Sequence, residues 1–233
     1  LLLYPLWHLC GYLVALRFDT GSFLLRMVSY SDVRSRREKG KTLISVTRGP
    51  DPREITRAAV ERIGGMERYV QKGNRVVIKV NISGGNPQIP GSFTSLAVGG
   101  EVVRMVRDAG GEPVIVDSDM IWTKFEPVAE AEGWIAWAQE EKVPLVNLRG
   151  TEQVRFNFGS GSAIGIVPVS RMLVDADVII SVPTMKTHLL TSVTLGMKNM
   201  YGTFPEENKA KYHRFGIEDV VVEVNAAFTP NLT

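Results

Sequence analysis

The sequence predicts an α/β protein with a mostly parallel sheet flanked by helices, a Rossmann-like three-layer arrangement. From residue 42 onward the hydrophobic pattern alternates between the two-residue period of strands and the 3.6-residue period of helices. The stretches "RVVIKV" (75–80) and "DVIISV" (177–182) are continuously apolar apart from their polar ends, which is typical of parallel strands buried on both faces. We therefore expect a single α/β domain over residues 42–233.

The first repeating unit is predicted from residues 42–80. "TLISV" (42–46) has the composition of a strand, and Asp51 can cap a following helix that carries Pro52 at its first position. Gly64 and Gly65 end this helix, because glycine tolerates the positive φ that helix C-termini require. The strand 75–80 follows, and then a loop rich in Gly and Pro at 83–92.

The remaining elements continue the alternation. Thr94 or Ser95 can cap a second helix, and apolar residues at helical spacing extend it to Gly110 and Gly111. Further elements are predicted as strand 113–118, helix 125–142, strand 144–148, strand 177–182 and helix 217–228. Two short β runs around a Gly/Ser turn predict a small β-hairpin at 153–170, within an insertion of about 151–172. "TPNLT" at the C-terminus resembles the beginning of another strand, so we expect a domain truncated there.

Residues 1–41 are expected to form an N-terminal extension outside this domain. The apolar run "LLLYPLWHLCGYLVAL" has 16 residues, fewer than the roughly 20 that a membrane-spanning helix needs, so no membrane span is predicted. The run also lacks the basic n-region and the cleavage site of a signal peptide. Because Met27 is the first methionine, residues 1–26 are interpreted as sequence upstream of the natural start.

Composition excludes several classes of function. The net charge is +2, and "RSRREKGK" (34–41) is the single basic run, best explained as a solvated arm, so nucleic-acid binding is not expected. Cys10 is the only cysteine and can form neither an internal disulfide nor the four-cysteine ligand set of an iron–sulfur cluster. A reducing compartment fits this cysteine content, which predicts a cytoplasmic location.

Polar side chains follow three of the predicted strands. Lys79 and Asn81 end the strand 75–80, Asp117 ends the strand 113–118, and a Lys- and His-rich stretch from 186 to 213 follows the strand 177–182. In open parallel sheets, ligands bind beyond the carboxyl ends of the strands, so these groups are expected at one edge. The alternative for Lys79 is a lysine that buries its stem and keeps its ammonium in water.

Lys186 and His188 are the predicted catalytic pair. They stand two residues apart and share a face if the chain stays extended there. A lysine can hold an anion, and a histidine can move a proton near neutral pH. The alternative is a solvated lysine beside a histidine that caps a turn.

Ligand-binding roles are predicted for a larger group, which combines cationic, amide and hydroxyl donors suited to a carboxylate or phosphate with a glycine that lets the backbone approach a ligand. The predicted group is Lys79, Asn81, Asp117, Thr194, Lys198, Asn199, Gly202, Lys211 and His213. "KAKYH" (209–213), which contains Lys211 and His213, is either an exposed turn or a flap over the site. No metal is predicted: His188, His213 and Asp117 are suitable ligand types, but no HExxH or paired-Cys spacing accompanies them. Neither a Walker loop nor a GxGxxG pattern is present, so no nucleotide is predicted.

Four stretches resemble the successive motifs of domain-of-unknown-function family 362: "RVVIKVNISGG", "TSLAVGGEVVRMVRDAGGEPVIVDS", "ADVIISVPTMKTHLLTSVTLGMKNMYGTFP" and "KAKYH". The resemblance covers roughly residues 43–233. It implies an α/β fold and motif positions at all the residues of the two groups above except Asp117, but it implies no settled reaction.

Members of this family are often labelled as iron–sulfur-centre proteins, and they often carry a ferredoxin-like segment with clustered cysteines. This chain lacks such a segment, so no iron–sulfur cluster is expected within it, and the cofactor is unknown. Similar sequences also continue past "PNLT" into a further strand and a glycine-rich acidic segment.

Two functions are predicted from these observations. The first is an enzyme that binds an anionic small molecule or cofactor, in a redox-related pathway. The alternative is a non-catalytic docking or electron-transfer scaffold for an iron–sulfur protein such as a ferredoxin-like partner.

Overall fold

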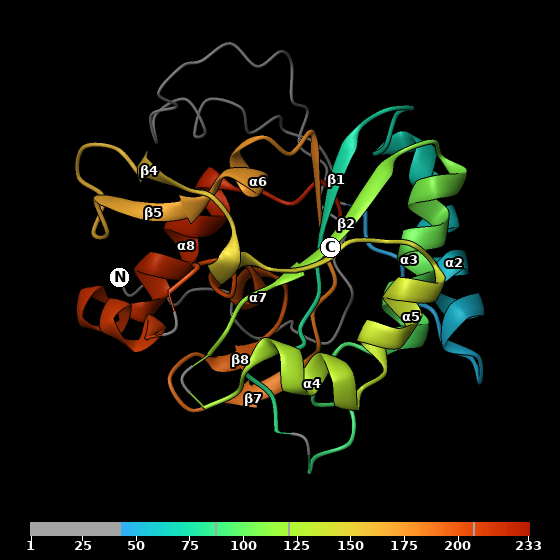
Figure 1. Ribbon diagram of the computed structural model, residues 1–233, viewed down its shortest axis with the longest axis horizontal. Coiled ribbons are helices and arrows are strands. Elements are labelled where there is room, and N and C mark those ends of the chain that lie inside the picture. Colours follow the sequence, from blue (N-terminus) through green and yellow to red (C-terminus); the bar gives the residue numbers. More distant parts are fainter. Residues whose placement is uncertain (1–42, 87, 121, 207) are drawn as a thin grey trace, which may run out of the picture.

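A four-stranded parallel sheet forms the centre of the computed structural model, which describes residues 43–233 except residues 87, 121 and 207 (Figure 1). The strand order is β3-β2-β1-β6. The strands are β1 (Arg75–Lys79), β2 (Glu112–Asp117), β3 (Leu145–Asn147) and β6 (Val178–Ser181). Every strand pair within this sheet is parallel, which confirms the predicted α/β architecture.

The alternation of side chains along β1 divides the core into two halves. Val76 and Ile78 belong to the apolar cluster on one face of the sheet, and Val77 belongs to the cluster on the other face. Because Lys79 stands two residues after Val77, it points to the same face as Val77. This period of two places a lysine inside the protein, at the carboxyl end of a central strand.

The first face is covered by the helices α2 (Pro52–Arg62), α3 (Leu96–Asp108), α4 (Phe125–Ala131) and α5 (Trp134–Glu140). Asp51 caps α2 by accepting a hydrogen bond from the Arg53 amide, as its sequence predicts. The fully buried Trp134 lies against Gly99 of α3, where an added Cβ would lie 2.4 Å from the indole. The missing side chain at Gly99 therefore lets α3 and α5 pack closely.

The opposite face is covered by α6 (Arg171–Val174), α7 (Gly196–Tyr201), α8 (Ile217–Ala227) and a β-hairpin. The hairpin pairs β4 (Gln153–Asn157) with β5 (Ile166–Ser170) in antiparallel register, which confirms the small predicted β-hairpin. These elements lie together on the side away from α2 and α3 (Figure 1).

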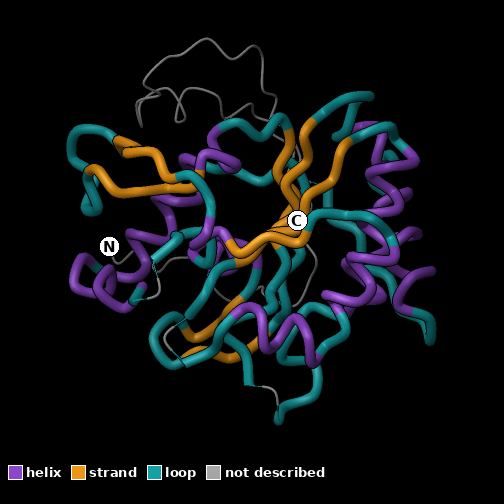
Figure 2. The backbone as a smooth tube through the Cα atoms, in the orientation of Figure 1, coloured by secondary structure: helices purple, strands orange, loops and turns teal. Residues whose placement is uncertain are grey.

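A second small antiparallel pair lies at the carboxyl edge of the sheet. It joins β7 (Lys186–His188) to β8 (Ser192–Thr194), separate from the central strands (Figure 2). Short 3₁₀ helices complete the fold at η1 (Met66–Arg68), η2 (Leu148–Gly150) and η3 (Lys209–Phe215). Leu232 makes an isolated parallel bridge to Ile180 at the outer side of β6.

Two predicted elements differ in the structure. Residues 43–46 form no strand, and only Ile44 takes part in a bridge; Thr47 instead donates a hydrogen bond to Ile55 of α2. The apolar side chains of this segment, Leu43, Ile44 and Val46, are all exposed, so they have no second layer to pack on. The predicted helix 125–142 is divided into α4 and α5 because Gly133 adopts a left-handed conformation between them.

Residues 1–26, together with the rest of the predicted extension, lie outside the described residues. Within the described part of the chain, no helix combines the length and the apolar character that a bilayer span demands.

Candidate functional site

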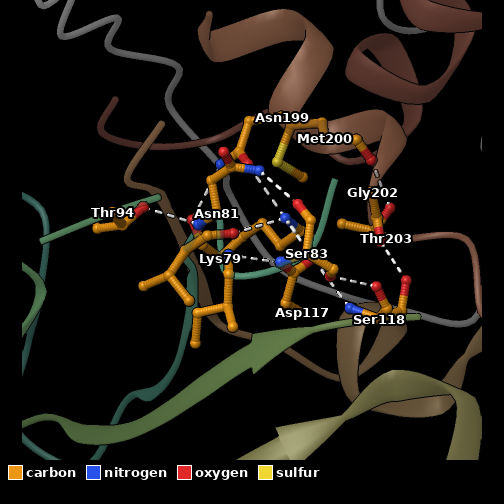
Figure 3. Close-up of polar contacts among 12 residues, drawn as sticks. Lys79, Asn81, Ser83, Thr94, Asp117, Ser118, Asn199, Met200, Gly202 and Thr203 are labelled. Atoms are coloured by element: carbon orange, nitrogen blue, oxygen red, sulfur yellow. Dashed lines mark hydrogen bonds and ion pairs between the residues drawn. The ribbon is translucent and has the colours of Figure 1, made fainter. Parts of the chain in front are cut away.

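A buried polar network joins the ends of β1 and β2 to α7, and Lys79 is at its centre (Figure 3). The side chain of Lys79 is only 1% exposed. Its ammonium donates to the Val80 carbonyl at 2.6 Å and to Oδ1 of Asn199 at 3.0 Å, and it lies 2.8 Å from Oδ1 of Asp117. An ammonium carries three N–H groups, so these three oxygens match its full hydrogen-bonding capacity.

Asp117 organises the turn that follows β1. Its Oδ2 accepts hydrogen bonds from the amides of Ile82 and Ser83, both at 2.8 Å, and its Oδ1 accepts one from its neighbour Ser118 at 2.9 Å. With the Lys79 ammonium, the carboxylate has four donors and is 2% exposed. Asp117 therefore has a structural position, and neither member of this ion pair is turned toward solvent.

Asn199 and Gly202 complete this network from α7 and its C-terminal end. The amide of Asn199 donates to the Lys79 carbonyl and to the Ser181 hydroxyl, both at 3.0 Å, and so links α7 to β1 and β6. An added Cβ at Gly202 would lie 2.9 Å from the Lys79 ammonium nitrogen. Gly202 is therefore the residue type that leaves room for Lys79, rather than one chosen for a turn.

A cleft of about 480 Å³ lies next to this network, between the loop after β1 and the β7–β8 hairpin. Its lining consists of Gly84, Gly85, Asn86, Ile89, Pro90, Gly91, Ser92, Met185, Lys186, Thr187, His188 and Thr194. Lys186 and Thr194 are directly opposite each other in the hairpin register. Three of the predicted site residues, Lys186, His188 and Thr194, thus share one cavity.

Lys186 connects the two walls of the cleft. Its ammonium donates to Oδ1 of Asn81 at 2.6 Å and to the Ser92 carbonyl at 2.9 Å, both on the β1 side. Burial lowers the pKa of Lys186 to about 8, with a smaller opposing effect from Asp117 and a further lowering from Lys79. This lysine is therefore mostly charged at pH 7 and loses its proton as the pH rises through about 8.

His188 has one ring nitrogen occupied by the backbone. Its Nδ1 accepts hydrogen bonds from the amides of Leu190 at 3.1 Å and Thr191 at 3.3 Å. This arrangement assigns the proton of the neutral ring to Nε2. Burial, and then the neighbouring Lys198, lowers the pKa of His188, which favours the neutral form of the ring.

Lys198 and His213 extend the cationic group behind the hairpin. The ammonium of Lys198 lies 4.3 Å from the centroid of the Tyr201 ring, and the His213 ring stacks on the same tyrosine with centroids 6.1 Å apart. Burial and the proximity of Lys186 lower the pKa of Lys198 to about 8. Burial and Lys198 lower the pKa of His213. Besides burial, the neighbouring basic side chains thus lower the pKa of His188, Lys198 and His213.

Lys211 differs from these residues because it has a carboxylate partner. Its ammonium forms an ion pair with Glu206, and it also lies 4.9 Å from the Tyr212 ring centroid. The neighbouring Lys209 was not among the predicted site residues, yet it is 1% exposed and donates to the Asp119 carbonyl. Its sequence context, "NKAKYH", gives no sign of burial, because lysine in a polar stretch is normally exposed.

The structure thus separates the predicted residues into three groups. Lys186, His188 and Thr194 line the cleft, with Asn81, Lys198 and His213 beside it. Lys79, Asp117, Asn199 and Gly202 form the buried support, and Lys211 pairs with Glu206. The sequence does not predict that the Ser92 carbonyl accepts from Lys186, because a backbone contact leaves no side-chain signal. Among the described residues, His, Cys, Asp and Glu form no group of three or more that could hold a metal.

The structure thus defines an α/β protein with basic side chains gathered at the carboxyl edge of a parallel sheet. The chain belongs to the family Domain of unknown function (DUF362), whose model matches residues 76–233. A thylakoid-associated protein of Synechocystis sp. is 32% identical over 189 residues, which cover 76% of this chain and 56% of that protein. The chain therefore spans a little over half the length of this relative. Neither description mentions an iron–sulfur centre, so that association stays a prediction.

Proposed function

We propose that this protein is an enzyme that binds an anionic small molecule in the cleft between the loop 83–92 and the β7–β8 hairpin. One observation carries the proposal: Lys186 and His188 line this cleft, and Lys198 and His213 lie beside it. Burial lowers the pKa of all four side chains, and repulsion within the group lowers it further for His188, Lys198 and His213. A bound carboxylate or phosphate relieves this repulsion, because it favours the charged form of every neighbouring base.

The hairpin geometry supports a distinct role for His188. Because Nδ1 accepts two backbone amides, protonating it would cost both hydrogen bonds. The neutral ring can donate through Nε2, so we assign His188 to hydrogen bonding with the ligand. Lys186 lines the cleft and has a pKa of about 8, which suits proton transfer near neutral pH.

The loop 83–92 supports binding from the opposite wall. Gly84, Gly85 and Gly91 line the cleft without side chains, so a ligand can approach the backbone closely. Lys186 already bridges to this wall through Asn81 and Ser92. An anion that takes one N–H of this ammonium would thus be held between both walls.

Calorimetric titration with sulfate tests the binding half of the proposal. The charge of sulfate is constant across the working pH range, so changes in affinity report on the protein. We expect Lys186→Ala and Lys198→Ala to weaken binding by about tenfold each, since each removes one charged donor. The exposed Lys72→Ala is the matched control and should bind as the wild type does. Wild-type affinity in both cleft variants would refute the proposal.

Turnover is tested with a mixture of cellular anionic metabolites. Incubation with wild-type protein should deplete one compound, and Lys186→Ala should leave it unchanged. His188→Asn is the informative companion, because an asparagine oxygen can still accept from the hairpin amides but supplies no ring N–H. Binding of sulfate without depletion of any compound would support a binding protein rather than an enzyme.

Docking of a ferredoxin-like protein is the second candidate function, and one observation favours it. Leu189 is 97% exposed at the turn between β7 and β8, and Leu190 beside it is also exposed. Exposed leucines next to a cationic cleft suit a protein surface. Leu189→Ser separates the two candidates, because it would weaken docking of an acidic ferredoxin but leave sulfate affinity unchanged.

A further inference from the structure

The cleft is larger than a simple anion requires. Its volume of about 480 Å³ lies in the range of pockets that hold organic ligands, whereas a phosphate or sulfate ion would fill only a small part of it. The remainder of the cavity therefore has room for another part of the ligand. What that part is can be argued from the other side chains of the lining.

Apolar side chains stand on both walls of the cavity. Ile89 and Pro90 belong to the loop after β1, and Met185 immediately precedes β7 on the opposite wall. Ile89 is 58% exposed and Met185 is 57% exposed, so neither is used to fill the core. Isolated exposed apolar residues are common, but here two line the same cavity from opposite sides.

The basic side chains of the lining, Lys186 and His188, belong to β7. Lys186 follows Met185 directly, and both side chains line the cavity. Lys186 reaches Asn81 and Ser92, while His188 lies close enough to Lys198 for that cation to lower its pKa. The lining thus combines a cationic part and an apolar part within one cavity. Methionine adapts its flexible, polarisable side chain to ligands of irregular shape.

We infer that the ligand of this cleft is an amphiphilic anion, with a phosphate or carboxylate joined to an apolar group of about ring size. The anionic group meets Lys186 and His188, and the apolar group lies between Ile89 and Met185. This inference rests on the proposed function for the position of the anion, and it adds the substrate class.

Two phosphate esters test the inference: methyl phosphate and phenyl phosphate carry the same charge near pH 7.5 but differ in apolar area. We expect phenyl phosphate to bind wild-type protein about tenfold more tightly, as burial of part of a ring predicts. In the double variant Ile89→Ser, Met185→Ser the affinities for the two esters should become nearly equal, with the affinity for methyl phosphate unchanged. Ile166→Ser, which changes an exposed residue of β5 outside the cleft lining, should keep the preference.

The possible outcomes separate the two proposals. Equal affinity of the two esters for the wild type would overturn the inference of an amphiphilic ligand while leaving anion binding intact. A preference for phenyl phosphate that is as large in the double variant as in the wild type would do the same. Binding of neither ester would overturn the proposed function and this inference together. A urea unfolding curve for each variant shows whether the serine substitutions preserve the fold.

Discussion

Lys79 shows how a lysine can support a site without contacting the ligand. The sequence predicts Lys79 as a ligand-binding residue at the carboxyl end of a buried strand. Its position at that end of β1 is confirmed. Its partner Asn199 lies 120 residues away, so the sequence cannot show that the ammonium is already fully bonded. We therefore assign Lys79 and Asp117 a structural role in the proposed site.

Replacement of Lys79 should cost stability rather than binding alone. Lys79→Met leaves Asp117 buried without its cation, and breaking such a pair costs about 3–5 kcal/mol of unfolding free energy. Urea denaturation measures this loss, with the exposed Lys72→Met as control. The double variant Lys79→Met, Asp117→Asn should recover part of it. A stability equal to wild type in Lys79→Met would show that the pair contributes nothing.

At the level of secondary structure, local signals predicted most elements, and tertiary packing decided the others. Asp51 and Pro52 mark the beginning of α2 in the sequence, and apolar runs mark β1 and β6. Residues 43–46 look like a strand but have no partner strand in the described sheet. The division between α4 and α5 depends on Gly133, which adopts a left-handed conformation. The sequence pattern alone does not show whether a glycine ends a helix or is tolerated inside it.

The contact between α3 and α5 gives a prediction at this scale. Gly99→Ala adds a Cβ 2.4 Å from the Trp134 ring, so we expect unfolding free energy to fall by about 1–3 kcal/mol despite the better helix propensity of alanine. Gly150→Ala is the matched control, because an added Cβ there has no heavy atom within 4 Å. Urea midpoints compare the two, and equal values would contradict close packing at Gly99.

For the molecule as a whole, the partly buried Lys186 and Lys198 and the buried Lys209 link pH to both stability and binding in opposite directions. The pKa of Lys186, Lys198 and Lys209 is lowered from 10.5 to about 8 in the fold. Between about pH 8 and 10 the unfolded chain keeps protons that the folded protein has lost, so stability contributed by these groups rises with pH. Below pH 8 the folded lysines are charged, and this contribution is absent.

Sulfate affinity should fall over the same interval, because the charged lysines that hold the anion lose their protons as pH rises through about 8. Urea unfolding and sulfate titration at several values between pH 7 and 10 measure the two trends. Lys186→Met, Lys198→Met should flatten both, apart from the stability change due to Lys209. Sulfate affinity that stays constant to pH 10 would contradict the role of these lysines.

The short distance between Gly202 and the Lys79 ammonium also has an evolutionary consequence. A side chain at position 202 would occupy the space of this ammonium, since its first carbon would lie 2.9 Å from the nitrogen. Positions 79 and 202 are therefore not free to drift independently, although 123 residues of sequence separate them. Because the added carbon would also lie 3.0 Å from the Asn199 carbonyl oxygen, a shorter residue at 79 relieves only part of the crowding, and we expect lineages that keep the lysine to keep glycine at 202.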